Sequence, residues 1–136
     1  MNSTSKDLIP DKRALLSILW IFVLINMIYA DIIGMLKPGY LEILEQTSRE
    51  LSGETVLLFA ILMEIPISMI ILSKILNRKV NRVANFITVP ISILWVVGPI
   101  FMNIGGPTPL SYLFFASIEV IAMLTIVYLA CKWSEK

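Results

Sequence analysis

Four long apolar stretches alternate with short polar connections along the chain, and this pattern predicts four membrane-spanning helices. The apolar stretches cover about residues 14–36, 55–76, 83–102 and 110–131. Each is close to the roughly 20 residues that cross a ~30 Å hydrocarbon layer as a helix. We therefore predict an all-α integral membrane four-helix bundle that forms a single domain over residues 1–136.

The first and third connections, which lie at the end of the bundle opposite the chain termini, are predicted to differ in structure. Lys-Pro-Gly at 37–39 ends the first span, since proline lacks an amide hydrogen and glycine tolerates unusual backbone angles. Residues 40–51 then place leucines near one face and glutamates around the rest, which predicts a short amphipathic interfacial helix rather than a polar loop. The connection at 103–110 has the composition of a tight turn.

Basic residues are unevenly distributed between the two sides of the predicted bundle. Nine of the eleven lysines and arginines lie in the two terminal segments and in the connection at 74–82. The opposite side carries only Lys37 and Arg49. Because cytoplasmic loops of membrane proteins are enriched in basic residues, we expect both termini to be cytoplasmic in a cell-membrane protein.

Composition supports membrane insertion and excludes several classes of function. The chain is 57% apolar and 15% charged, has a mean hydropathy of +0.84 and carries a net charge of +1. A soluble domain is usually about 45–50% apolar and about 25% charged. The expected partners are therefore membrane lipids and a lipophilic small molecule, and the charge gives no reason to expect nucleic acid.

The sequence also restricts the available chemistry. It contains one cysteine, Cys131, and no histidine. An internal disulfide, a Cys-x-x-Cys redox pair and histidine ligation of metal or haem are thereby excluded. We predict neither a cofactor nor a metal, and carboxylates, amides and hydroxyls are left to carry any function.

Two glutamates stand at matching depth inside the predicted spans. Glu64 lies nine residues past Thr55, and Glu119 lies nine residues past Leu110, on two spans that run in the same direction. A charge at mid-bilayer costs roughly 2.5–3.5 kcal/mol on insertion scales, so such residues usually face the bundle interior. We predict that these two acids face each other in a closed midplane pocket; neutral acids that only join helices are the structural alternative.

Further polar residues in the spans are candidates for the same site. Asn26 matches the depth of the two glutamates, and Asp31 lies in the outer third of the first span, on another side of that helix. Ser68 continues a stripe of small residues beside Glu64, and Pro66 removes a backbone donor close to it. Supporting candidates are therefore Pro66, Ser68 and Tyr112, whereas Asn85 stands apart and Trp20, Trp95 and Trp133 are interpreted as packing or interface residues.

Three classes of function fit these residues. The leading hypothesis is a protein that binds or carries a small lipophilic molecule, which in one form of the hypothesis is cationic. Proton exchange at Glu64 and Glu119 would accompany binding or release. A membrane-embedded isomerase or cyclase with paired carboxylic acids is the second, and a structural or accessory subunit is the third. A carrier with only four helices could need a second copy of the chain, so a homo-oligomer is a further expectation.

Five short motifs resemble those of a family of small four-span prokaryotic membrane proteins of unknown function. They are LWIF at 19–22, ILMEIP at 61–66, NRVAN at 81–85, PT-x(3)-Y-x-FF-x(3)-E from Pro107 to Glu119, and KW at 132–133. The resemblance implies a four-span fold and no established chemistry. In size and in the acid of the second span, the chain is also similar to DoxX-like four-helix proteins.

Overall fold

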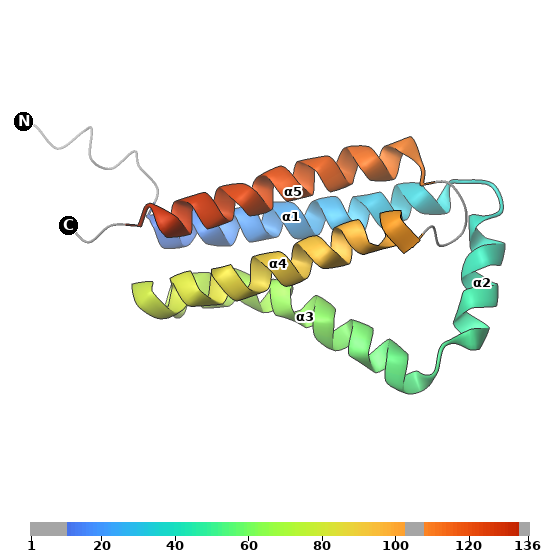
Figure 1. The fold of residues 1–136 in the computed structure, drawn as a ribbon, viewed down its shortest axis with the longest axis horizontal. Coiled ribbons are helices and arrows are strands. Elements are labelled where there is room, and N and C mark those ends of the chain that lie inside the picture. Colours follow the sequence, from blue (N-terminus) through green and yellow to red (C-terminus); the bar gives the residue numbers. More distant parts are fainter. Residues whose placement is uncertain (1–10, 103–107, 134–136) are drawn as a thin grey trace, which may run out of the picture.

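The computed structural model describes residues 11–102 and 108–133, and these residues form five α-helices (Figure 1). The helices are α1 (Lys12–Met35), α2 (Tyr40–Glu50), α3 (Gly53–Ile75), α4 (Arg78–Met102) and α5 (Leu110–Cys131). All except α2 are long and apolar enough to cross a membrane. The prediction of an all-α bundle with a short helix between the first two spans is confirmed. The predicted turn at 103–110 falls largely outside the described residues.

Polar side chains set where three of the spanning helices begin. Asp11, Ser52 and Asn77 precede α1, α3 and α4, and each accepts a hydrogen bond from a backbone N–H of the first helical turn at 3.1–3.3 Å. Such caps satisfy amide groups that have no partner within the helix. The predicted start of the third span at residue 83 was therefore too late, because Asn77 extends α4 to Arg78, before the apolar segment begins.

The four long helices form a ring in which α3 and α5 lie on opposite sides. α1 packs against both α3 and α5, and α4 packs against the same two helices (Figure 1). The core between them is apolar, and its largest fully buried side chains include Trp20 of α1, Met69 of α3 and Met123 of α5. Helix α2 lies across one end of the bundle, between the ends of α1 and α3.

Helix α3 packs into the bundle mainly along its second half. Its buried residues are Pro66, Met69 and Ser73, whereas residues 56–61 are all exposed. Figure 1 shows the first half of α3 leaving the bundle at an angle toward α2. Pro66 stands near the point of departure, and an interior proline is a common cause of a change in helix direction.

Hydrogen bonds from neighbouring helices hold the second half of α3 in place. The Ser17 hydroxyl of α1 donates to the carbonyl oxygen of Ile70 at 2.8 Å, and the Asn81 amide of α4 donates to that of Ser73 at 2.7 Å. Within the described residues, the first half of α3 has no hydrogen bond of this kind to α1, α4 or α5. The two halves therefore differ in packing because only one of them is fixed by polar contacts.

A buried polar network joins three helices near the same end of the bundle. Trp20 Nε1 of α1 donates to Asn85 Oδ1 of α4 at 2.8 Å, and Asn85 Nδ2 donates to Asn81 Oδ1 at 2.7 Å. Asn81 completes the network through its bond to Ser73 of α3. Sequence analysis treated Trp20 as a packing residue and Asn85 as isolated, so it missed this network; the Asn-x-x-x-Asn spacing of 81 and 85 was its available signal.

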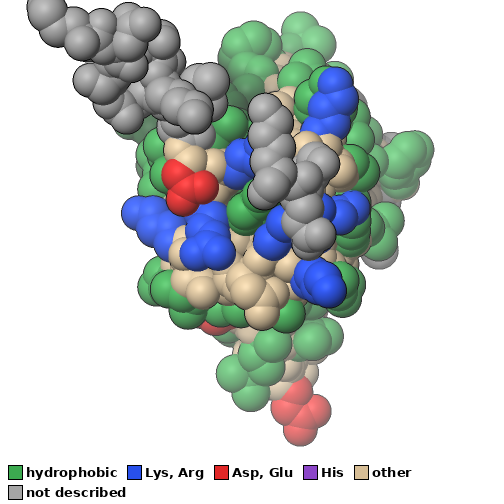
Figure 2. All heavy atoms as spheres, turned by 90° about the vertical axis from the view of Figure 1, so that its left-hand side faces the viewer, with side chains coloured by type: hydrophobic (Ala, Val, Ile, Leu, Met, Phe, Trp, Pro, Cys, Tyr) green, Lys and Arg blue, Asp and Glu red, His purple; other side chains and the backbone are tan. Residues whose placement is uncertain are grey.

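Basic side chains cover the end of the bundle where α1 begins and α5 ends. Figure 2 looks onto this end and shows lysine and arginine side chains gathered on it. Lys12 Nζ donates to the carbonyl oxygen of Lys132 at 2.9 Å, so the start of α1 and the end of α5 lie together. The described basic residues in these segments are Lys12, Arg13, Lys74, Arg78, Lys79, Arg82 and Lys132.

Candidate functional site

Glu64 does not lie where the sequence prediction placed it. Its side chain is exposed on the outside of α3, and it makes no hydrogen bond or ion pair with any described residue. Pro66 is buried toward the bundle, and residues two positions apart in a helix point about 200° apart. The prediction that Glu64 faces Glu119 is therefore wrong, since α3 turns Pro66 inward and Glu64 outward.

Glu119 is buried in the bundle, as expected for an acid inside a span. Its side chain is only 2% exposed, and its Oε1 atom has no hydrogen-bond partner among the described residues. The carboxyl group that interacts with it electrostatically is Asp31 of α1, not Glu64. The structure thus separates the predicted pair, because α5 packs mainly against α1 and α4 rather than against α3.

Two tyrosines accompany Asp31 and Glu119 toward the α2 end of the bundle. Tyr112 of α5 interacts electrostatically with both acids, and its hydroxyl donates to the carbonyl oxygen of Val96 in α4 at 2.8 Å. Tyr40 opens α2; partial burial, with a smaller contribution from the nearby Asp31 carboxylate, raises its pKa above the usual range. Asp31 itself is exposed at the surface of the bundle.

Two other predicted site residues form hydrogen bonds only within their own helices. Asn26 donates to the carbonyl oxygen of Phe22 at 2.8 Å, and the Ser68 hydroxyl donates to that of Ile65 at 2.8 Å. Both side chains are partly exposed. The structure therefore brings neither residue into contact with Glu119 through a hydrogen bond, and each has a local structural role.

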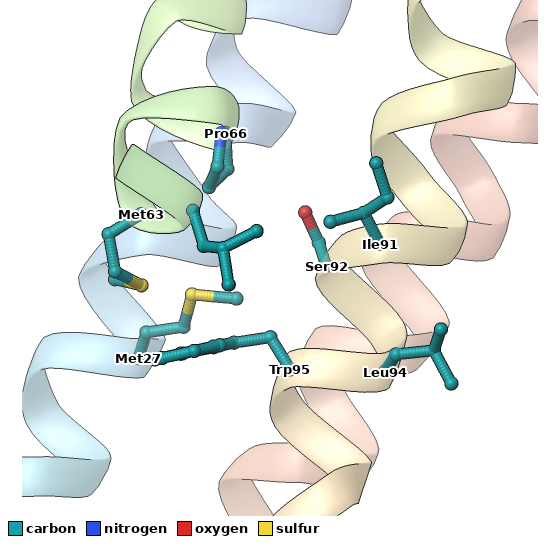
Figure 3. A pocket seen from close by; sticks show the side chains of 8 residues that line it. Met27, Met63, Pro66, Ile91, Ser92, Leu94 and Trp95 are labelled. Atoms are coloured by element: carbon teal, nitrogen blue, oxygen red, sulfur yellow. The ribbon is translucent and has the colours of Figure 1, made fainter. Parts of the chain in front are cut away.

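An apolar cavity of about 290 Å³ lies between α1, α3 and α4 (Figure 3). This volume is near the lower end of the ~300–1,000 Å³ typical of small-molecule pockets. Leu94, which is 72% exposed, is part of the wall, so the cavity reaches the surface of the bundle. The lining residues are Met27, Leu62, Met63, Pro66, Ile91, Ser92, Leu94 and Trp95.

Ser92 gives this apolar cavity a polar atom. The side chain is 2% exposed, and its hydroxyl has no hydrogen-bond partner among the described residues. In Figure 3 the hydroxyl oxygen points into the cavity, toward Pro66. A buried hydroxyl without a partner is unfavourable by roughly 1–3 kcal/mol, which a bound molecule with a hydrogen-bonding group would offset.

Pro66 and Trp95 contribute further features to the cavity wall. Proline has no N–H, so Pro66 cannot donate the usual helical bond to the carbonyl of Leu62, another lining residue. The ring of Trp95 makes an edge-to-face contact with Phe59 of α3, with the ring centroids 5.4 Å apart. This aromatic pair connects α4 to the diverging half of α3 beside the cavity.

The composition of the wall defines what the cavity can bind. It contains no acidic or basic side chain, so the predicted cavity lined by carboxylates is corrected to one lined by apolar groups and a serine. Within the described residues, no three acidic or cysteine side chains lie close enough to ligate a metal ion. Sequence analysis identified Pro66 but missed Ser92, because one serine in an apolar span carries little information by itself.

The fold and the four apolar helices define a small helical-bundle membrane protein with a cavity between three of its long helices. The chain belongs to the family of unknown function DUF6326, whose family model matches residues 7–136. No curated protein and no solved structure matches it significantly. The comparisons thus support the predicted four-span family of unknown function and provide no link to DoxX-like proteins.

Proposed function

We propose that this membrane protein binds a small, uncharged lipophilic molecule in the cavity between α1, α3 and α4. The supporting observation is the Ser92 hydroxyl, which is buried, has no hydrogen-bond partner in the described part of the chain and is directed into an otherwise apolar cavity. A ligand carrying one hydroxyl or carbonyl group on a compact apolar body matches this wall. An uncharged ligand fits better than the cationic one considered from sequence, because no carboxylate lines the cavity.

The route into the cavity follows from the divergence of α3. Leu94 lies at the surface of the bundle, and the first half of α3 diverges from the other helices (Figure 1). A molecule dissolved in the membrane could therefore reach Ser92 laterally, without crossing water. Phe59 and Trp95 lie beside this path as a pair of rings that can rearrange at low cost, since such contacts contribute about 0.5–1.5 kcal/mol.

The proposal places the basic end of the bundle in the cytoplasm. The basic residues of α1, α3 and α4 gather at this end with Lys132, which follows α5, whereas the α2 end carries Glu42, Glu45, Glu50 and Glu54. This distribution supports the positive-inside orientation expected from the sequence. In that orientation, α2 lies at the outer surface and the cavity opens toward lipid.

Ligand content of the purified protein tests the proposal. Mass spectrometry of organic extracts is expected to find a lipophilic molecule bound to the wild type and to a Leu124→Trp control on the exposed face of α5. Met63→Trp fills the cavity and should remove the molecule. Ser92→Ala should weaken rebinding about threefold to tenfold, the effect of one hydrogen bond, measured through quenching of Trp95.

The same measurement distinguishes ligand binding in the cavity from a second candidate function, which is acid chemistry at Asp31 and Glu119. Its support is the buried Glu119 carboxyl group, whose Oε1 atom has no hydrogen-bond partner among the described residues, and the influence of the Asp31 charge from the neighbouring helix α1. Glu119→Gln should leave ligand content unchanged if the cavity is the site, because Glu119 does not line it. Ligand loss in Glu119→Gln, with full retention in Met63→Trp, would reject the cavity in favour of the acids.

A further inference from the structure

The outer face of α3 carries a regular pattern of exposed residues. Leu57, Ala60, Glu64, Ile67 and Ile71 follow one another at alternating spacings of three and four, and all five are exposed. This is the spacing by which one helix packs along another. We call these five residues the α3 seam.

The α3 seam faces away from the rest of the bundle. Pro66, Met69 and Ser73 point inward to α1 and α4, whereas Glu64 lies about 200° around the helix from Pro66. Lipid alone would cover the apolar members of the seam without difficulty. Glu64 is different, since a carboxyl group near mid-membrane needs a hydrogen-bonding partner and finds none among the described residues.

Within the described part of the chain, no side chain of the same bundle forms a hydrogen bond or ion pair with Glu64. Every lysine and arginine of the chain lies at or beyond the end of a span, so none stands at the depth of Glu64. A protonated carboxyl group both donates and accepts a hydrogen bond, so it is complementary to another carboxyl group at the same depth. A two-fold axis along the membrane normal provides that second group, because it places each residue near the axis opposite its own copy.

We propose that two copies of this chain associate through the α3 seam, with the two Glu64 side chains hydrogen-bonded across the interface. Ala60, one turn from Glu64, allows the two helices to approach closely, and the isoleucines and Leu57 pack on either side. A single polar position in an apolar seam also fixes the register of the two helices. The proposal is independent of the cavity, which lies on the opposite side of α3.

Disulfide cross-linking in native membranes tests the interface. In a Cys131→Ser background, Ala60→Cys should form a covalent dimer on mild oxidation. Leu58→Cys is the matched control, since Leu58 is also exposed but lies about 200° around α3 from Ala60. Cross-linking is expected to be at least about tenfold greater for Ala60→Cys. Equal yields at both positions, no dimer at Ala60→Cys, or a product with a different protein would overturn the proposal.

Substitutions of Glu64 test the central contact in the same Ala60→Cys background. Glu64→Gln keeps a group that both donates and accepts, so the cross-linking yield should stay near that of the parent. Glu64→Leu inserts equally well but removes the hydrogen bond, and should weaken association about threefold to thirtyfold. A Glu64→Leu variant that dimerises as well as Glu64→Gln would remove the carboxyl pair from the interface. Met63→Trp, directed at the cavity, should leave the yield unchanged.

Discussion

At the scale of single residues, Asn85 has the clearest structural role. Its side chain accepts from Trp20 and donates to Asn81, so it connects α1 to α4 in a fully buried setting. We expect Asn85→Ala to lower the free energy of unfolding by about 1–3 kcal/mol, because the Trp20 N–H is left unpaired. Reversible unfolding in mixed detergent micelles would measure this loss.

Asn26→Ala is the matched control for that prediction. Asn26 bonds only to the carbonyl of Phe22 in its own helix and is partly exposed. Its substitution should change the free energy of unfolding by less than about 0.5 kcal/mol. Equal effects of the two substitutions would show that the buried network contributes nothing specific.

The residue scale also shows how far sequence reasoning reaches. The depth of Glu64 and Glu119 follows from counting along a helix, and the burial of Glu119 agrees with the cost of a charge in lipid. That count does not give the rotation of a helix about its axis, which decides the direction of each side chain, when the polar residue has apolar residues on all sides along the helix. Apart from Glu64, the spanning part of α3 is apolar on nearly every side, so its hydrophobic pattern does not distinguish the inward face, which the hydrogen bonds at Ile70 and Ser73 fix.

At the scale of elements, the turn between α1 and α2 depends on Gly39. Its φ of 78° lies in the left-handed region, where a side chain is strained. Gly39→Ala should therefore lower the free energy of unfolding by about 1 kcal/mol. Gly98→Ala in α4 is the control, because nothing lies within 4 Å of the added methyl group and alanine favours a helix. Thermal unfolding of both variants would distinguish the effect of backbone strain at position 39 from the general effect of replacing a glycine by alanine.

The elements themselves were largely predictable, and their packing was only partly so. Apolar length identified all four spans, and leucine and glutamate spacing identified α2. Composition could not predict which helices pack against α3, since an apolar helix packs equally well against lipid and against protein. Ser17 and Asn81, which fix α3, are ordinary small polar residues in the sequence and acquire their role only when the helices meet.

At the scale of the whole molecule, orientation can be tested with the native cysteine. Cys131 is exposed at the end of α5, next to Lys132. A membrane-impermeant maleimide added to spheroplasts should not label it. Gln46→Cys on α2, in a Cys131→Ser background, should be labelled. The reverse pattern would place the basic end outside and contradict the proposed orientation.

The one-sided divergence of α3 gives the molecule a tapered outline. The four long helices lie together at the basic end, whereas α3 and α2 widen the opposite end (Figure 1). An inclusion of this shape occupies more area in one leaflet than in the other, so the surrounding lipids must differ in number between the two leaflets. The bilayer around the protein is therefore expected to bend toward the narrow end, with the wide α2 end on the convex side. Strongly curved vesicles that hold the α2 end in their outer leaflet should incorporate the protein more readily than flat membranes.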